Sequence, residues 1–212
     1  MSLSKYIDHT ILKATATPND IKQLCEEAVL HDFYAVCVNG CYVSLAKEAL
    51  AKSTIKVAAV IGFPLGAMAT EAKVLETKTC IALGADEIDM VINVGMLQSG
   101  NYQSVEDEVK QIKNTTGNKV LKVIIETCYL TNEEKKIACE LAKNAGADFV
   151  KTSTGFGTGG ATLEDVQLMK NVVGNDLKIK ASGGIRDKKT ALEYIELGVS
   201  RIGTSSGIKI VS

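Results

Sequence analysis

The sequence AGADFVK at residues 145–151 decides the fold, together with two related stretches, LGADEID at residues 83–89 and LGVSRIG at residues 197–203. In each stretch a helix is expected to end at a glycine in the C′ position, and a short loop then leads into a strand. The fifth residue after each glycine is Asp89, Lys151 or Gly203. Equal offsets predict that these three residues lie at similar depth near the carboxyl ends of their strands, where a (β/α)8 barrel builds its active site.

Apolar strand-like runs alternate with amphipathic helical runs along all 212 residues, which is typical of a parallel α/β fold. One helix has a clear start, because Thr17 is followed by Pro18 at the first helical position and by Asp20 three residues after the cap. About eight strands in about 200 residues predict a single-domain (β/α)8 TIM barrel over residues 1–212, since a doubly wound sheet normally has fewer strands and an early nucleotide loop. The strands are expected near residues 6–10, 35–39, 56–62, 87–93, 121–126, 148–153, 178–182 and 201–204.

The composition restricts the class of partner. The 24 lysines and arginines balance 25 aspartates and glutamates without a long run of either sign, so no surface for nucleic acid or an anionic membrane is indicated. The expected partner is a small molecule. The N-terminus has no apolar signal region and no run is long enough to cross a bilayer, so a cytoplasmic location is expected. The six cysteines and two histidines lack the spacing of a disulfide framework or a metal site, and neither a metal nor another cofactor is expected.

Two lysines each end a strand-like run and pass into a loop of small polar residues, Lys151 in FVKTS (149–153) and Lys180 in KIKASGG (178–184). A free lysine amine titrates near ~10.4, so only about one in 2,500 is unprotonated at pH 7. A second ammonium roughly 5 Å away would lower that pKa by about 2 to 2.5 pH units, and desolvation can lower it further. The pair favours Schiff-base catalysis; the alternative is two solvated surface lysines.

Several acids end predicted strands. Asp89 lies in the apolar run EIDMVIN (87–93) and needs a buried partner, which inward-facing lysines would supply. Its functional interpretation is proton transfer, and the alternative is a structural salt bridge. Glu126 and Asp8 are expected to have architectural or hydrogen-bonding roles. Lys122 could neutralise the barrel interior, and Cys37, at the end of the second strand, is expected to line the mouth of the barrel.

Three glycine-rich loops follow the last three strands. GFGTGG (155–160) matches the pattern of a dinucleotide-binding loop, but the strand about 20 residues further on ends in KAS (180–182) instead of the acid that holds a ribose. A loop whose bare amides approach a phosphate or a substrate hydroxyl is favoured. SGGIR (182–186) and GTSSG (203–207) lie where barrels bind phosphate, and the alternative is that they are ordinary turns.

Together these stretches resemble the deoxyribose-phosphate aldolase family. The resemblance is carried by VKTSTGF (150–156), KIKASGGIR (178–186), RIGTSSG (201–207), YIDHTIL (6–12), VIGFPLG (60–66) and DEIDMV (86–91). It implies a class I aldolase on a (β/α)8 barrel that needs no metal, acts in deoxyribonucleoside catabolism and forms a homodimer or homotetramer. Such an enzyme reversibly cleaves 2-deoxy-D-ribose 5-phosphate to acetaldehyde and D-glyceraldehyde 3-phosphate.

Carried over by motif, the resemblance implies that Lys151 forms the Schiff base, Lys180 lowers its pKa and Asp89 serves proton transfer. It also implies that the phosphate group is held by Gly183, Gly184, Gly203, Ser205 and Ser206. Asp8, Thr10, Cys37 and Gly155 are further candidates for contacts with the substrate.

The chain departs from the family pattern in two places. Phe156 stands where some members have a lysine, so part of the phosphate charge must be met by another residue. The sequence ends in IVS (210–212), whereas some members have a tail whose terminal tyrosine reaches the active site; such a role is not expected here unless the chain is truncated. Two alternatives stay open: a class I aldolase or transaldolase for a different phosphorylated sugar, and a non-catalytic barrel in which Lys151 and Lys180 anchor an anion.

Overall fold

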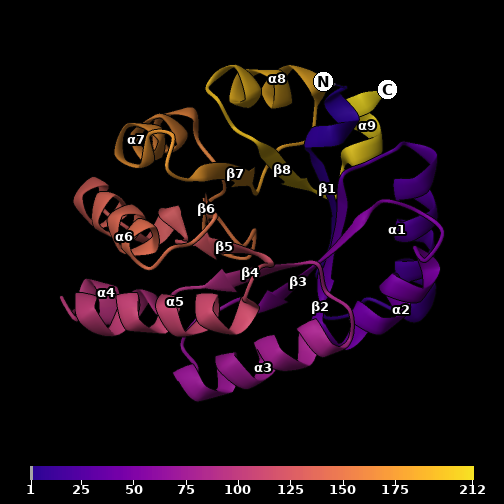
Figure 1. Ribbon diagram of the computed structural model, residues 1–212. Coiled ribbons are helices and arrows are strands. Elements are labelled where there is room, and N and C mark those ends of the chain that lie inside the picture. Colours follow the sequence, from indigo (N-terminus) through magenta and orange to yellow (C-terminus); the bar gives the residue numbers. More distant parts are fainter. Residues whose placement is uncertain (1) are drawn as a thin grey trace.

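The computed structural model describes residues 2–212, in which parallel strands close into a barrel surrounded by helices (Figure 1). Each strand pairs with the next one in sequence, and the last pairs with the first. The predicted (β/α)8 barrel is therefore confirmed. The strands are β1 (Ile7–Ile11), β2 (Ala35–Asn39), β3 (Lys56–Ile61), β4 (Glu87–Val91), β5 (Val120–Ile124), β6 (Phe149–Lys151), β7 (Lys178–Ser182) and β8 (Arg201–Thr204).

The helices form a ring outside the barrel, and the two chain ends lie close together beside α9 (Figure 1). In residues 2–212, no helix combines the length and the apolar character needed to cross a membrane. The α-helices are α1 (Pro18–Leu30), α2 (Val43–Ala49), α3 (Thr70–Ala82), α4 (Val94–Gln98), α5 (Tyr102–Thr116), α6 (Asn132–Asn144), α7 (Leu163–Val173), α8 (Lys188–Glu196) and α9 (Gly207–Val211). Short 3-10 helices are η1 (Leu3–Tyr6), η2 (Gly40–Tyr42) and η3 (Thr127–Tyr129).

The helix boundaries follow from local chemistry. The Thr17 hydroxyl accepts the amide hydrogen of Asp20, and the Asp20 carboxylate accepts from the Thr17 amide, so the predicted start of α1 is a complete capping box. At the C-terminal ends of three helices, a glycine with positive φ follows. These are Gly84 after α3, Gly146 after α6 and Gly198 after α8, with φ of +105°, +78° and +93°. These left-handed conformations are easily adopted only by glycine, and they confirm the predicted helix-to-strand repeat.

The strand boundaries agree less well with prediction. Residues 35–39, 178–182 and 201–204 are strands as expected, and most of the other bounds shift by one or two residues. The run predicted over residues 148–153 is a strand only at Phe149–Lys151. Beyond Lys151 the backbone leaves the regular ladder, since the amides of Ile125 and Thr127 donate to the adjacent carbonyls of Lys151 and Thr152. The Thr154 amide then donates to the side chain of Glu126.

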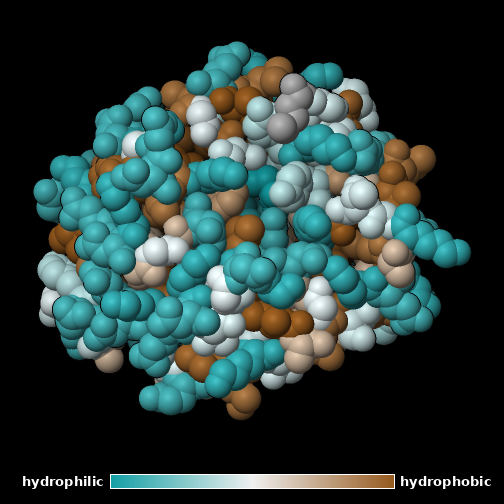
Figure 2. Space-filling view, viewed as in Figure 1, coloured by the Kyte–Doolittle hydropathy of each residue, from teal (hydrophilic) through white to brown (hydrophobic). Residues whose placement is uncertain are grey.

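Two hydrophobic clusters stabilise the barrel. The larger one fills the layer between strands and helices, and the smaller one, of Leu12, Cys37, Ala58 and Val60 with Phe63 packed against it, lies on β1–β3 and their loops. The remaining strands β4–β8 bury charged side chains at alternate positions instead. The outer face seen in Figure 2 is mostly hydrophilic, with small hydrophobic groups between the polar residues. Polar and charged side chains therefore lie both on the outside of the molecule and inside the barrel, on β1 and β4–β8.

Candidate active site

Buried ion pairs join the charged side chains of β1 and β4–β8. Three carboxylates and four cationic groups contact one another here, each at most 4% exposed. An unpaired buried charge would cost several kcal/mol, so each of these groups depends on the others. The group, called here the charged cluster, consists of Asp8, Glu87, Asp89, Lys122, Lys151, Lys180 and Arg201.

Asp89 is the centre of the charged cluster. Its Oδ1 accepts a hydrogen bond from Lys122 Nζ at 2.6 Å. Its Oδ2 accepts from Lys151 Nζ and from Lys180 Nζ, both at 2.8 Å. These three lysines hold the pKa of Asp89 well below its usual range, although burial alone would raise it. The prediction that inward-facing lysines would pair with Asp89 is confirmed.

Asp8 anchors the other side of the same group. It accepts from Lys180 Nζ at 2.5 Å and from Arg201 Nε at 2.7 Å, and the two cations lower its pKa against the opposing effect of burial. Arg201 also contacts Glu87 at 2.5 Å. Lys180 therefore bridges two carboxylates, which raise its pKa and keep it protonated at neutral pH.

Lys151 behaves differently from the other lysines of the cluster. Its pKa lies below the ordinary lysine value, chiefly because burial penalises the ammonium form. The charge of Lys180 lowers it further, and Asp89 opposes both effects. From the sequence, the neighbouring ammonium was expected to be the main cause of the lowered pKa. Burial is the larger cause instead, because the side chain of Lys151 is only 3% exposed.

The formal charges of the cluster explain why one lysine is set apart. Four cationic groups face three carboxylates, so the charges balance only when one lysine is neutral. The carboxylates raise the pKa of Lys122 and of Lys180, whereas the pKa of Lys151 is lowered. A neutral Lys151 amine is a nucleophile, and its cationic neighbours stay charged.

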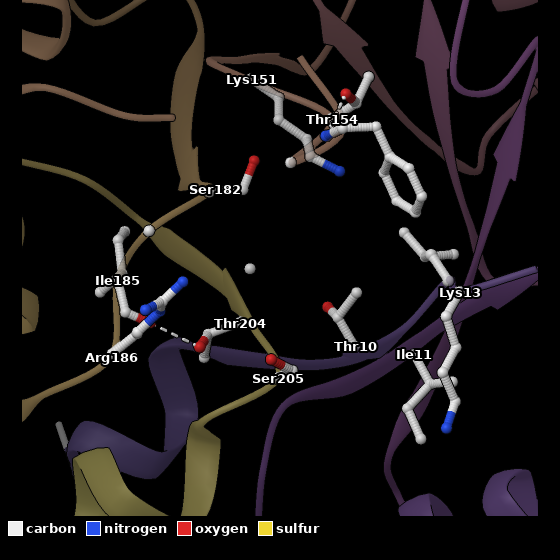
Figure 3. Close-up of a pocket in the computed structure, with 16 residues that line it drawn as sticks. Thr10, Ile11, Lys13, Lys151, Thr154, Ser182, Ile185, Arg186, Thr204 and Ser205 are labelled. Atoms are coloured by element: carbon white, nitrogen blue, oxygen red, sulfur yellow. Dashed lines mark hydrogen bonds between the residues drawn. The ribbon is translucent and has the colours of Figure 1, made fainter. Parts of the chain in front are cut away.

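A cavity of about 520 Å³ opens above the cluster, and Lys151 lines it. Lys151 and Thr154 reach into this cavity from one side, and Arg186, Thr204 and Ser205 lie on the opposite side (Figure 3). Lys180 and Asp89 are fully buried and outside the cavity lining, and Asp89 contacts Lys151. The predicted residues Thr10, Gly155, Gly183, Gly184, Gly203 and Ser205 also line it.

The structure separates some predicted substrate-contacting residues from the cavity. Asp8 and Cys37 are completely buried, at 0% exposed. Neither residue lines the cavity. Burial raises the pKa of the Cys37 thiol, and this residue packs in the small inner hydrophobic cluster instead of lining the mouth. Ser206 is also outside the lining, and its amide donates to the Thr204 hydroxyl at 2.9 Å.

Two basic residues at the cavity were not among the predicted site residues. Arg186 and Lys13 both line it, and Arg186 directly follows the glycine pair of the loop after β7. Its place in the SGGIR stretch was a usable signal, since a cation beside bare amides favours an anion. Lys13 follows β1 in a loop without such a signal.

The glycine-rich loop after β6 has a packing role that its sequence pattern concealed. A methyl group on Gly157 would lie 2.7 Å from the Cys128 Sγ, and one on Gly160 would lie 2.2 Å from the carbonyl oxygen of Gly183. These glycines therefore permit close approach of neighbouring loops. Of the glycines at 155–160, Gly155 is the one that lines the cavity. Within residues 2–212 no group of three or more histidine, cysteine, aspartate or glutamate side chains is arranged to hold a metal ion.

Sequence comparisons match the chain over its whole length. A family model described as DeoC/LacD family aldolase matches residues 3–211. The chain is 59% identical over 211 residues to a deoxyribose-phosphate aldolase of Finegoldia magna, covering 100% of this chain and 99% of that protein. It is 61% identical over 216 residues to the deoxyribose-phosphate aldolase of Thermococcus gammatolerans, covering 100% and 96%.

Solved structures give the same match. An aldolase designated QR15 superposes with a TM-score of 0.95 at 46% identity, covering 99% of this chain and 94% of that one. The tetrameric deoxyribose phosphate aldolase of Aeropyrum pernix superposes with a TM-score of 0.89 at 33% identity, covering 99% and 89%.

Proposed function

The chain belongs to the DeoC/LacD family of aldolases, and we propose that it reversibly cleaves 2-deoxy-D-ribose 5-phosphate to acetaldehyde and D-glyceraldehyde 3-phosphate through a Schiff base on Lys151. The observation that carries the proposal is the placement of one lysine with a lowered pKa in the lining of a cavity, in contact with a cluster whose carboxylates keep Lys180 protonated. An amine of this kind is what Schiff-base formation at neutral pH requires.

The chemistry follows from the neutral amine. Lys151 Nζ attacks the C1 carbonyl, and loss of water gives an iminium that accepts the electron pair of the C2–C3 bond when it breaks. At the same time a water molecule in the cavity takes the proton of the C3 hydroxyl, so C3 becomes the aldehyde carbon of D-glyceraldehyde 3-phosphate. The enamine left on Lys151 is protonated at C2 and hydrolysed to acetaldehyde, which regenerates the amine.

Asp89 contributes to proton transfer from below the cavity. It is fully buried and holds both Lys151 and Lys180 at 2.8 Å. It therefore acts through Lys151 or a water molecule instead of touching the substrate. This arrangement also fixes the Lys151 amine in one orientation, which lowers the entropy cost of attack.

The phosphate group binds on the far side of the cavity from Lys151. Gly183 and Gly184 have φ of +86° and +83° and leave their backbone bare beside Arg186. Arg186 supplies the positive charge that Phe156 does not, because an arginine forms charge-assisted hydrogen bonds to phosphate oxygens. Gly203 and Ser205 complete this side. Binding the remote phosphate orients C1 against Lys151.

Replacing Arg186 by alanine is expected to raise KM for 2-deoxy-D-ribose 5-phosphate by about tenfold to a hundredfold, with a smaller change in kcat, because a charge-assisted hydrogen bond to phosphate is lost. KM for unphosphorylated 2-deoxy-D-ribose should change little. Lys188→Ala is the matched control, since Lys188 is an exposed cation two residues away that does not line the cavity. Equal losses for both substrates in the Arg186 variant would contradict phosphate binding by this residue.

The pH dependence of the wild-type protein should reflect Lys151. Since its pKa is lowered, kcat/KM should rise with pH while the ammonium form loses its proton, and level off below the ordinary lysine value of ~10.4. Steady-state kinetics from pH 5 to pH 10 check this, with circular dichroism at each pH as the control for folding. A rate that still rises about tenfold per pH unit near pH 10 would contradict a lowered pKa.

Release of D-glyceraldehyde 3-phosphate from 2-deoxy-D-ribose 5-phosphate, followed with a coupled dehydrogenase, tests the substrate directly. A five-carbon 2-deoxy sugar should be cleaved much faster than D-fructose 6-phosphate or D-ribose 5-phosphate. Faster cleavage of a ketose phosphate would favour the transaldolase alternative. No cleavage of any of these sugars by the folded protein, together with saturable phosphate binding, would favour the non-catalytic barrel.

Fewer observations support the proposed oligomeric state and cellular location of the protein. A homodimer or homotetramer is supported by the tetrameric relative from Aeropyrum pernix and by exposed leucines such as Leu30 and Leu65, at 80% and 78%. Light scattering after size exclusion would measure the mass. A cytoplasmic location is supported by the free state of the six cysteines, which is usual in reducing compartments. A role in deoxyribonucleoside catabolism follows from the proposed substrate. Residues 1–212 are proposed to act as one domain.

A further inference from the structure

Glu126 has an unusual backbone for a residue beside the active site. It lies between β5 and η3 with φ of 53° and ψ of 67°, and with Asp32 it is one of two non-glycine residues at positive φ in the described chain. A side chain other than glycine is disfavoured in this left-handed region, and such residues cluster at functional sites. The strained backbone must therefore be held by contacts of Glu126 with its surroundings.

Those contacts lead to one residue of the loop after Lys151. Glu126 is 2% exposed, and its carboxylate accepts from the Thr154 amide at 3.1 Å and 3.3 Å and from the Thr154 hydroxyl. The same hydroxyl accepts the Phe156 amide hydrogen at 3.0 Å. A continuous chain of hydrogen bonds thus runs from Glu126 through Thr154 to Phe156.

The backbone around Glu126 is bulged in a way that aims its side chain at this loop. The Ile125 amide donates to Lys151 O and the Thr127 amide donates to Thr152 O, each at 3.0 Å. A regular parallel ladder would advance two residues on both strands, whereas here two residues on one side oppose one residue on the other. Bulges of this kind redirect a side chain and are frequent next to active sites.

Apolar packing alone does not fix the loop that Glu126 holds. Phe156 is 52% exposed and lies between the main cavity and a second hollow of about 120 Å³, which Glu126 and Thr154 also line. The Phe63 ring packs edge-on against the Phe156 ring, with 5.3 Å between the ring centroids. Gly155, between Thr154 and Phe156, has φ of +85° and open space around it. In the described chain, every side-chain hydrogen bond between segments 125–130 and 152–160 joins Glu126 to Thr154.

We infer that Glu126 is a positioning residue, which acts through Thr154 to hold Gly155 and Phe156 as one wall of the cavity. It lines the second hollow instead of the main cavity, so it does not touch the reacting atoms. The inference rests on the proposed function, because the wall that it fixes is the one beside the Lys151 nucleophile. Its effect should fall on the fit of the full sugar phosphate and spare imine formation at Lys151.

The test compares two ways of cutting the same link. Glu126→Gln keeps the size of the side chain but removes its negative charge and puts an NH2 donor in place of one of the two oxygens that accept from Thr154. Thr154→Val removes the hydroxyl but keeps the shape. Each should lower kcat/KM for 2-deoxy-D-ribose 5-phosphate by about tenfold to a hundredfold, mainly through KM, because misplacing a wall by about 1 Å has effects of that order. The double variant should lose no more than the more impaired single variant. Thr154→Ser, which keeps the hydroxyl, should restore most of the activity.

A matched control exists elsewhere in the chain. Glu134 accepts from the Thr131 amide at 2.7 Å and from its hydroxyl at 2.8 Å, which is the same pair of contacts at the exposed start of α6. Glu134→Gln and Thr131→Val should lower thermal stability without a change in KM. Hydrogen exchange of the peptide covering residues 152–160 should be faster in Glu126→Gln and unchanged in Glu134→Gln, and this readout needs no substrate.

The outcomes separate the two claims. If wild-type protein forms no borohydride-reducible adduct with acetaldehyde, the proposed function fails whatever the variants do, and the exchange experiment still tests the loop. If the wild type forms the adduct, wild-type KM and exchange in both Glu126→Gln and Thr154→Val would overturn the inference. An equal loss of acetaldehyde adduct and of sugar-phosphate cleavage in Thr154→Val would also overturn it, because Lys151 itself would then be displaced.

Discussion

Replacing Lys151 by leucine should lower kcat for 2-deoxy-D-ribose 5-phosphate by about 10⁴-fold or more, because removal of a covalent nucleophile costs on that order. The variant should still fold. Asp89 keeps Lys122 and Lys180 as partners, and the three carboxylates of the charged cluster then face three cations. Release of D-glyceraldehyde 3-phosphate measures the loss, and thermal unfolding measures the stability.

Lys178→Leu is the control for this variant. Lys178 begins β7, is exposed and contacts the Phe149 ring instead of the cluster, so its loss should leave kcat close to the wild-type value. A Lys151→Leu protein that retains more than about one hundredth of wild-type kcat would show that covalent catalysis takes place elsewhere.

Replacing Lys180 by leucine should lower kcat/KM at pH 7 by about a hundredfold and move the activity to higher pH. Without Lys180, three carboxylates face Lys122, Lys151 and Arg201, and the formal charges balance only if Lys151 is protonated. Its pKa should therefore rise. Each unit of that rise reduces the neutral amine about tenfold at neutral pH.

The pH profile separates this explanation from simple damage to the site. In Lys180→Leu the rise of kcat/KM should occur about two pH units above that of the wild type, and much of the activity should return near pH 10. Asp8 keeps Arg201 and Asp89 keeps Lys122 as partners in this variant, so the protein should fold. An unchanged profile with a uniformly lower rate would contradict the charge-balance explanation.

The sequence predicted the fold well because the signals for it are local. The glycines that follow α3, α6 and α8 and the capping box at Thr17 each depend on a few neighbouring residues. The alternation of strand and helix patterns then leaves few architectures. Strand ends were less predictable, because the segment after β6 takes its hydrogen bonds from residues far along the chain, such as Glu126, 28 residues before Thr154.

The candidate site was predictable where strand position alone determines it. Lys151, Lys180 and Asp89 meet because they share the interior side of their strands. The partners of Asp8 could not be predicted, since Arg201 reaches it from the far end of the chain. The main cause of the lowered Lys151 pKa could not be predicted either, because it is the burial of the side chain, which only the structure shows. Cys37 and Ser206 lie outside the cavity lining, and strand position alone did not indicate this, because the Cys37 side chain packs against Leu12, Ala58 and Val60 inside the barrel.

Borohydride reduction in the presence of 2-deoxy-D-ribose 5-phosphate or acetaldehyde, followed by peptide mapping, tests the central claim most directly. The reduced adduct should be found on Lys151, the lysine with the lowered pKa that lines the cavity, and should be absent from Lys151→Leu. An adduct on Lys180 would reverse the roles of the two lysines and contradict the charge assignment. No adduct on the folded wild-type protein would contradict Schiff-base catalysis altogether.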